Sequence, residues 1–162
     1  MIAIRAATPT DEPLIFATWL RAFKHGSAFP RHIPDRVFFD EHHDVVEQLL
    51  ERSTVTVATP VDDTDVILSW SAVETVEPVD GGPSPLVVHF VYTKPAFRRT
   101  GIARQLLAHV ARELDAGTPV FYSHETFLIR QPGIARHVAR AFFNPYAALR
   151  VAAKGGNGNA DD

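Results

Sequence analysis

The stretch from Leu86 to Leu107 constrains the fold of this chain more than any other segment. It begins with a run of aliphatic and aromatic residues that only His89 interrupts, a pattern typical of a buried strand. From Ile102 onward, apolar residues recur every three to four positions, which predicts one buried helical stripe. Pro95 and Gly101 punctuate the segment between the two patterns. The sequence therefore predicts a strand, a turn and a helix, in that order.

The predicted turn has the chemistry of an anion-binding site. The first backbone N–H groups of a helix have no intrahelical partner, and the helix dipole adds positive potential there. Gly101 lets a ligand approach the backbone closely, because it has no side chain. Four cations surround the turn, namely Lys94, Arg98, Arg99 and Arg104. We therefore expect a phosphate or pyrophosphate ligand, with an ordinary turn and a solvated basic rim as the alternative.

The run from Pro95 to Ala103 resembles the acyl-CoA-binding motif of the GNAT superfamily of N-acetyltransferases, Arg/Gln-x-x-Gly-x-Gly/Ala. Arg98, Gly101 and Ala103 fill its three defining positions, and a Leu pair follows, as is usual in the family. The resemblance implies an α/β (α+β) fold with a GNAT-like mixed, centrally splayed sheet of about six strands and about four flanking helices. It also implies acetyl-CoA as the acyl donor and no metal.

The resemblance further implies how acetyl-CoA is held. The pantetheine arm would pair with the backbone of the predicted strand, and a strand N–H near Val91 would polarise the thioester carbonyl. The pyrophosphate would lie on the N–H groups of the turn. The implied cofactor-binding residues are Val91, Tyr92, Thr93, Arg98, Arg99, Thr100, Gly101, Ile102, Ala103 and Arg104.

Three residues are candidates for proton transfer. His89 lies two residues before Val91, so it shares a face with Val91 near the expected acetyl position, and an imidazole suits a general base at neutral pH. A buried core histidine is the alternative. Glu74 is a second candidate for the general base and would act through a water molecule. A solvated carboxylate at the end of a strand is the alternative. Tyr146 is the candidate acid for the CoA thiolate, with core packing as its alternative and Tyr122 or Ser123 as substitutes.

Other segments complete a single domain over residues 1–154, followed by a glycine-rich tail at 155–162 that we expect to be disordered. The predicted order is strand, two helices, three strands, helix, strand, helix and strand, which resembles the order of a GNAT domain. The predicted elements are a strand at Ile2–Ala6, a helix from Asp11 to Gly26, a loop at Ser27–Phe39, a helix at Asp40–Arg52, strands at Thr54–Ala58 and Val66–Val73, a strand at Val120–His124, a helix at Ile134–Phe143 and a strand at Ala147–Ala152. GNAT domains commonly place two strands after the last helix, so the final strand is either missing or supplied by a partner subunit in a homodimer.

Aromatic residues in the first two helices and their loop are candidates for an acceptor pocket or for the core. They are Trp19, Phe23, Phe29, Phe38 and Phe39. Acidic residues of the same region, Asp35, Asp40 and Glu41, would attract a cationic amine. His42 and His43 are adjacent, so on a helix they point about 100° apart, and we expect no shared metal site.

Composition limits the classes of function. The net charge of −3 gives no basic excess for nucleic-acid binding, and the chain has no cysteine, which excludes thiol nucleophiles and disulfides. It shows no secretory signal and no membrane-spanning run, so we expect a soluble cytoplasmic protein. The sequence predicts an N-acetyltransferase that acts on a primary amine of a small molecule or a protein by direct attack in a ternary complex. A non-catalytic acyl-CoA-binding module is the alternative, and a nucleic-acid-modifying enzyme is a weaker third.

Overall fold

The computed structural model describes residues 1–77, 81–112, 114, 117–126 and 141–149. Within these ranges it contains six strands, three α-helices and three short 3-10 helices. The strands are β1 (Ile2–Ala6), β2 (Thr54–Pro60), β3 (Ser69–Thr75), β4 (Leu86–Thr93), β5 (Val120–Tyr122) and β6 (Ala141–Phe143). The α-helices are α1 (Glu12–Gly26), α2 (Asp35–Arg52) and α3 (Ile102–Ala111), and the 3-10 helices are η1 (Pro30–His32), η2 (Pro95–Phe97) and η3 (Pro145–Leu149).

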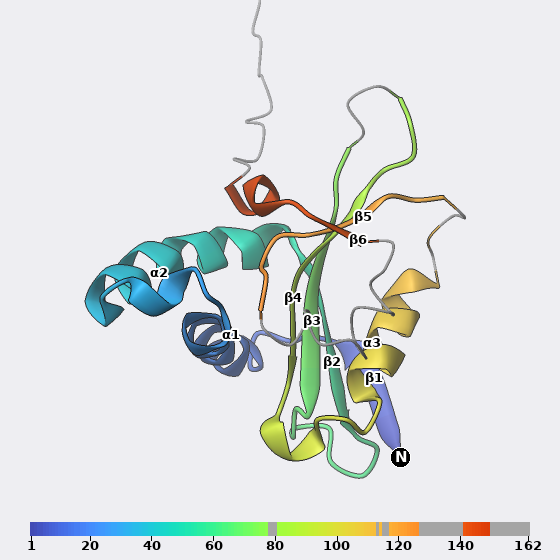
Figure 1. Cartoon of the computed structure of the whole chain (residues 1–162). Coiled ribbons are helices and arrows are strands. Elements are labelled where there is room, and N and C mark those ends of the chain that lie inside the picture. Colours follow the sequence, from blue (N-terminus) through green and yellow to red (C-terminus); the bar gives the residue numbers. More distant parts are fainter. Residues whose placement is uncertain (78–80, 113, 115–116, 127–140, 150–162) are drawn as a thin grey trace, which may run out of the picture.

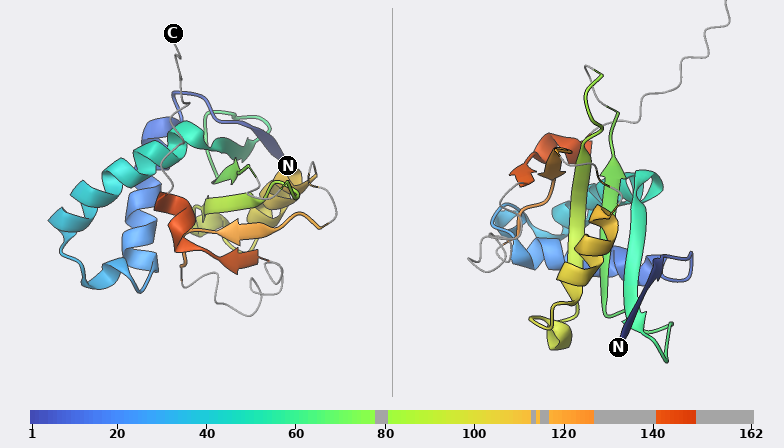
Figure 2. Two further views of the ribbon diagram at one scale, coloured as in Figure 1. Left: turned by 90° about the horizontal axis from the view of Figure 1, so that it is seen from above. Right: turned by 90° about the vertical axis from the view of Figure 1, so that its right-hand side faces the viewer.

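All six strands form one mixed sheet in the order β1-β2-β3-β4-β5-β6. The first four strands run antiparallel to their neighbours, whereas β5 is parallel to β4 and β6 is parallel to β5. Helices α1 and α2 cover one face of the sheet and α3 covers the other (Figure 1), and the side view in Figure 2 shows α3 lying across the strands. The predicted mixed α/β fold with a sheet of about six strands is confirmed.

The main core lies between the sheet and α1. Trp19 of α1 is fully buried, and its ring lies 5.5 Å from that of Trp70 on β3 and 5.4 Å from that of Phe90 on β4. A smaller cluster lies under α3, where Ile102 and Leu106 pack against β2 and the chain that leads into β3. Trp19 is therefore a core residue, and α1 holds the middle of β4 in place.

The sheet opens at the middle of β4. Ala72 pairs with Phe90, but Val73 pairs with Val88, so the backbone of His89 has no partner in the ladder with β3. Such a β-bulge bends the strand and changes the phase of its side chains. In the part of the chain that the structure describes, β5 pairs with β4 only through the first three residues of β4. The second half of β4 therefore has an open side, which is the predicted central splay.

Helix α2 begins at Asp35 rather than at Asp40, so the predicted loop is too long. Lys24 explains the short connection, because its ammonium is buried and donates to the carbonyl oxygens of Pro30 and Ile33. It also lies 3.3 Å from the Asp35 carboxylate in the first turn of α2. Lys24 therefore holds the α1–α2 connection together, and no local sequence pattern predicts this contact.

The predicted C-terminal elements are wrong where the structure describes them. Residues 141–143 form β6 instead of the end of a helix, and residues 147–149 belong to η3 instead of the start of a strand. Phe143 lies 5.4 Å from Tyr122 across the β5–β6 pair, and such cross-strand aromatic contacts override a helical pattern. The rest of the predicted helix and strand and the predicted tail lie outside the described residues. Strand β3 begins at Ser69, later than the predicted Val66.

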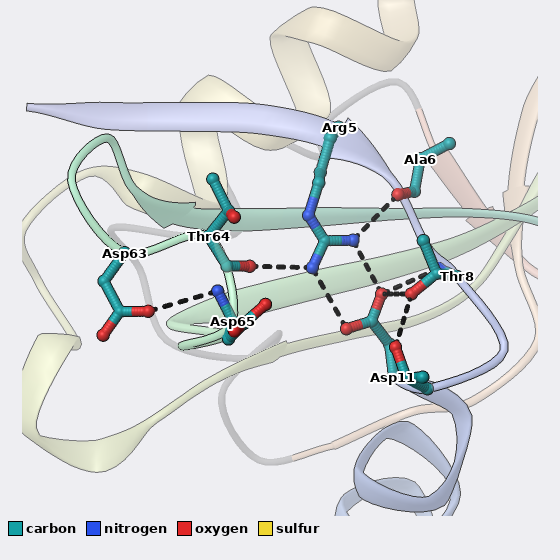
Figure 3. A network of polar contacts seen from close by, with 8 residues as sticks. Arg5, Ala6, Thr8, Asp11, Asp63, Thr64 and Asp65 are labelled. Atoms are coloured by element: carbon teal, nitrogen blue, oxygen red, sulfur yellow. Dashed lines mark hydrogen bonds and ion pairs between the residues drawn. The ribbon is translucent and has the colours of Figure 1, made fainter.

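Asp11 occupies the N-cap position of α1, but its carboxylate makes no capping hydrogen bond. Arg5 of β1 takes it in a bidentate pair, with N–O distances of 2.7 and 3.1 Å, and the backbone N–H and hydroxyl of Thr8 donate to it as well (Figure 3). The second guanidinium nitrogen of Arg5 also reaches the carbonyl oxygen of Thr64. The network joins β1, the start of α1 and the β2–β3 connection.

Asp11→Asn is expected to lower the free energy of unfolding at pH 7 by about 1–2 kcal/mol, because it breaks a charge-assisted pair. The hydrogen bond from Arg5 is the main cause that lowers the pKa of Asp11 from 3.8 to about 2. A folded-state pKa below the unfolded value stabilises the protein above about pH 4, and this stabilisation is lost as the pH falls toward 2. In urea unfolding, the difference between the two proteins should shrink over that interval.

Asp63→Asn is the control, because Asp63 is exposed in the same network and its carboxylate accepts the Asp65 N–H at 3.2 Å and, among the described residues, forms no ion pair with Arg5. It should change stability by less than about 0.5 kcal/mol. Equal losses in both variants would contradict the role given to Asp11.

Among the described residues, no helix is both long and apolar enough to cross a membrane.

Candidate active site

The turn before α3 presents backbone N–H groups on an open surface. Gly101 has a φ of +86° and Arg99 a φ of +67°, both in the left-handed region, and the Thr100 hydroxyl closes the turn by donating to the Phe97 carbonyl at 2.6 Å. The first helical bond runs from Gln105 N–H to Gly101, so the N–H groups of residues 102–104 have no acceptor within the helix. A Cβ at position 101 would meet no protein atom within 4 Å. The glycine is therefore required by the backbone, and the space above it is free for a ligand.

The cations of the turn lie around this surface. Arg98, Arg99 and Arg104 are exposed, and Lys94 is half-buried. A hollow of about 810 Å³ opens beside the turn and is lined in part by Thr100 and Ile102. The cations of the turn suit a phosphorylated ligand, whereas the wall of the hollow also carries the carboxylates of Asp62 and Asp63.

Two residues of β4 point their backbone N–H and C=O groups into the opening of the sheet. Along a strand, the N–H and C=O groups of successive residues point alternately to the two sides. Lys94 N–H donates to Leu68 on the β3 side, and the Tyr92 carbonyl accepts from Ser69 on the same side at 2.6 Å. Val91 and Thr93 must therefore direct their N–H and C=O groups away from β3, where β5 has already diverged. On that side Arg98 Nε donates to the Thr93 carbonyl at 3.3 Å. The backbone groups of Tyr92 face β3, so they are not available to a ligand in the opening.

His89 is enclosed at the bulge and hydrogen-bonded through both ring nitrogens. It is 1% exposed, its Nε2 lies 2.8 Å from Glu74 Oε2, and its Nδ1 lies 2.8 Å from Ser123 Oγ. The same Glu74 oxygen accepts from Arg52 Nε at 3.0 Å. Burial lowers the pKa of His89, while the contact with Glu74 acts in the opposite direction. The bulge places His89 on the face of its neighbour Phe90, so the expectation that it shares a face with Val91 is wrong.

The hydrogen bonds continue beyond Ser123 to two more histidines. Ser123 Oγ lies 2.8 Å from His124 Nδ1, and His124 Nε2 lies 3.1 Å from Nε2 of His42 on α2. Burial lowers the pKa of His42 to about 4 and that of His124 well below its usual value. Sequence reasoning missed the joint role of these residues. It treated His42 only as a metal candidate, and no spacing pattern relates it to His124.

A cavity of about 740 Å³ lies between α1, α2, η3 and the segment after β5. Its wall is mostly apolar, and the polar groups on it include His42, Ser123, His124 and two carboxylates. The lining residues are Phe23, Ser27, Ala28, Phe29, Ile33, Val37, Phe38, Glu41, His42, Val45, Ser123, His124, Glu125, Thr126, Phe143, Pro145, Ala148 and Leu149. An apolar cavity with a few convergent polar groups is the usual form of a small-molecule site.

Solved structures with the same architecture include two proteins assigned as acetyltransferases. The one from Pyrococcus furiosus superposes with a TM-score of 0.63 at 16% identity, covering 86% of this chain and 91% of the other. The one from Clostridium difficile 630 gives a TM-score of 0.60 at 15% identity, covering 86% and 90%. A transcriptional regulator from Bacillus halodurans C-125 gives 0.52 at 16% identity, covering 95% of each chain. The chain has the GNAT fold. No protein-family model and no curated protein matches its sequence.

Within this GNAT fold the sequence-predicted residues fall into two groups. The turn residues and the outward-facing residues of β4 lie along one path from α3 into the splay, while His89 and Glu74 lie behind it in the hydrogen-bonded cluster. Tyr146 is 76% exposed on η3, next to the cavity-lining Pro145 and two residues before Ala148, which also lines the cavity. Of the aromatic candidates, Phe23, Phe29 and Phe38 line the cavity.

The acidic candidates and His43 lie in different surroundings. Glu41 lines the cavity, whereas Asp35 pairs with Lys24 and Asp40 lies 3.8 Å from Arg36. His43, Asp44 and Glu47 bring their ligand atoms within 4.8 Å of one another, but all three are exposed and none belongs to the cavity wall. His42 lines the cavity, whereas His43 is exposed outside its wall.

Proposed function

We propose that this protein is an acetyl-CoA-dependent N-acetyltransferase that moves an acetyl group to a primary amine by direct attack in a ternary complex. The observation that carries the proposal is the open backbone of β4, which leads from the cationic turn toward the apolar cavity. Ser123 N–H makes the last bond to β4, at Val88, and the next residues, His124 to Thr126, line the cavity. The opening and the cavity are thus neighbours.

Acetyl-CoA fits this path from one end to the other. Its phosphates would accept bonds from the N–H groups of residues 102–104 and meet the surrounding arginines. The pantetheine amides would pair with Val91 and Thr93 like an added strand. Val91 N–H would then face the thioester carbonyl, where a fixed donor stabilises the developing oxyanion.

The acid–base groups follow from the same arrangement. We take His89 and Glu74 as one unit, because they are 2.8 Å apart and share Arg52 as a neighbour. Tyr146 would donate its phenolic proton to the CoA thiolate, since it is exposed next to the cavity wall. Holding the amine and the thioester in the reactive orientation lowers the activation barrier, by about 7–11 kcal/mol for well-oriented reactants.

The cavity favours a small amine with an apolar body. Its size lies within the range of about 300–1,000 Å³ that is common for small-molecule pockets. Phe23 and Phe38 supply aromatic surface, and the carboxylate of Glu41 suits an approaching ammonium group.

The test is calorimetric titration with acetyl-CoA and with CoA, followed by a thiol-release assay with 2-phenylethylamine, spermidine and glycine. We expect micromolar or tighter binding of both, and thiol release that depends on an amine. Binding without release for any amine would favour a non-catalytic acyl-CoA-binding module. An absence of binding would refute both proposals.

A further inference from the structure

Four hydrogen bonds in series connect the cavity wall to Glu74. We call the residues His42, His124, Ser123, His89 and Glu74 the histidine chain. Its successive contacts are 3.1 Å between the two Nε2 atoms, 2.8 Å from His124 Nδ1 to Ser123 Oγ, 2.8 Å from Ser123 Oγ to His89 Nδ1, and 2.8 Å from His89 Nε2 to the carboxylate. The chain brings together α2, the segment after β5, β4 and β3; its three middle members are buried, and its two ends, His42 and Glu74, are half-buried.

The donors in the chain can be assigned from one end. Arg52 only donates, so Glu74 Oε2 accepts from it and from His89 Nε2–H. A neutral His89 then accepts at Nδ1 from the Ser123 hydroxyl, and Ser123 Oγ accepts from His124 Nδ1–H. His124 Nε2 must accept from His42 Nε2–H. Every ring is neutral and satisfied in this arrangement, and His42 keeps Nδ1 as an unprotonated acceptor.

The stable place for an added proton is the far end of the chain. His42 faces the rings of Phe23 and Phe38, at 5.0 and 5.1 Å, as well as His124, and burial lowers its pKa to about 4. His124 is fully enclosed, and its two histidine neighbours lower its pKa further. Burial lowers the pKa of His89 as well, but among the three rings only His89 has a carboxylate beside it that favours its charged form, and Arg52 partly opposes this. The other charged groups of the cavity wall are Glu41 and Glu125.

We propose that the histidine chain is a proton relay, in which His42 accepts the proton of the attacking amine and the charge comes to rest on the His89–Glu74 pair. The inference rests on the proposed function. The amine N–H bond breaks as a bond to His42 Nδ1 forms, and the Nε2 proton of His42 passes to His124. The Nδ1 proton of His124 passes to Ser123, whose own proton passes to His89 Nδ1. After the intermediate collapses, the reverse passage returns one proton to the cavity. There it neutralises the thiolate or replaces the proton that Tyr146 has donated, so that the products are the amide and CoA.

In this relay His42 is a catalytic residue that touches the substrate, and the four inner residues position and carry the proton. An imidazole that must keep the proton in a desolvated cavity is a weak base, whereas one that passes it on acts with the basicity of the His89–Glu74 pair. The arrangement thus explains how an enclosed histidine can serve an amine that it does not contact.

The first test is nitrogen-15 NMR of the imidazoles in the protein without ligand at neutral pH. We expect His42 and His89 to carry hydrogen on Nε2 and His124 to carry it on Nδ1. Ser123→Ala should leave the folded spectrum intact and release His124 from its fixed tautomer. Hydrogen on His42 Nδ1, or a charged His124, would overturn the proposal whether or not the protein is an enzyme.

The second test is the pH dependence of kcat with acetyl-CoA and the most reactive amine from the thiol-release assay. Ser123→Ala should lower kcat about 10- to 50-fold and move the acidic limb of the profile toward pH 4, because His42 then acts alone. Ser123→Thr, which keeps the hydroxyl, should recover most of the loss, and KM for acetyl-CoA should change less than about twofold.

A matched pair of histidine variants completes the test. His124→Gln keeps one donor and one acceptor but cannot transfer a proton, so it should resemble Ser123→Ala. His109→Gln, at an exposed histidine late in α3, should match the unaltered protein. If the acidic limb of the pH profile is unchanged in Ser123→Ala and His124→Gln, the relay is refuted, but the proposed acetyltransferase activity is not. The predicted tautomers without turnover of any amine would instead refute the proposed function.

Discussion

Gly101→Asp is expected to raise the dissociation constant for CoA by at least about 100-fold, which corresponds to about 2.7 kcal/mol. The glycine adopts a φ of +86° at the start of α3, where the proposed phosphates meet backbone N–H groups. An aspartate there would place a negative charge and a side chain in the space that the ligand needs. Isothermal titration with CoA measures the change directly.

Gly117→Asp is the matched control for the backbone. Gly117 has a φ of +98°, and a Cβ there also meets no protein atom within 4 Å. Both variants should therefore lose a similar amount of stability, about 1–2 kcal/mol for a non-glycine residue in the left-handed region. Only Gly101→Asp should lose CoA affinity. Equal affinities for CoA in the two variants would contradict the proposal that the turn before α3 binds CoA.

Val91→Pro is expected to lower kcat by about 100- to 1,000-fold, the range seen when one oxyanion donor is removed. Proline has no N–H, and the N–H of residue 91 points into the opening of the sheet rather than to β3. The substitution therefore removes the proposed oxyanion donor and leaves the β3–β4 ladder its hydrogen bonds. Single-turnover kinetics with acetyl-CoA would separate the chemical step from binding.

Thr93→Pro tests whether the effect belongs to one N–H or to the strand. Thr93 also faces the opening, but it lies two residues farther from the proposed acetyl position. We expect KM for acetyl-CoA to rise several-fold with little change in kcat. Circular dichroism and the melting temperature would verify that both variants fold. Equal losses of kcat would assign the effect to distortion of β4.

The N-terminal helix and the region around α3 were predictable because their signals are local. Apolar spacing from Ile102 and the glycine before it define α3, and the strand ahead of it is a continuous apolar run. The predicted boundaries of helices and strands were wrong where contacts between residues far apart in the sequence set them. Lys24 brings forward the start of α2, and pairing with β5 turns residues 141–143 from an expected helix into a strand.

The sequence by itself determined the mixed α/β order of elements and the cationic turn ahead of α3, since each depends on residues a few positions apart. The tertiary structure decided the phase of β4 and the surroundings of His89. A single unpaired residue shifts every later side chain to the other face, and composition does not reveal where a strand will bulge. It also decided the histidine chain, because His42 and His124 are 82 positions apart and meet only when α2 packs beside the segment after β5.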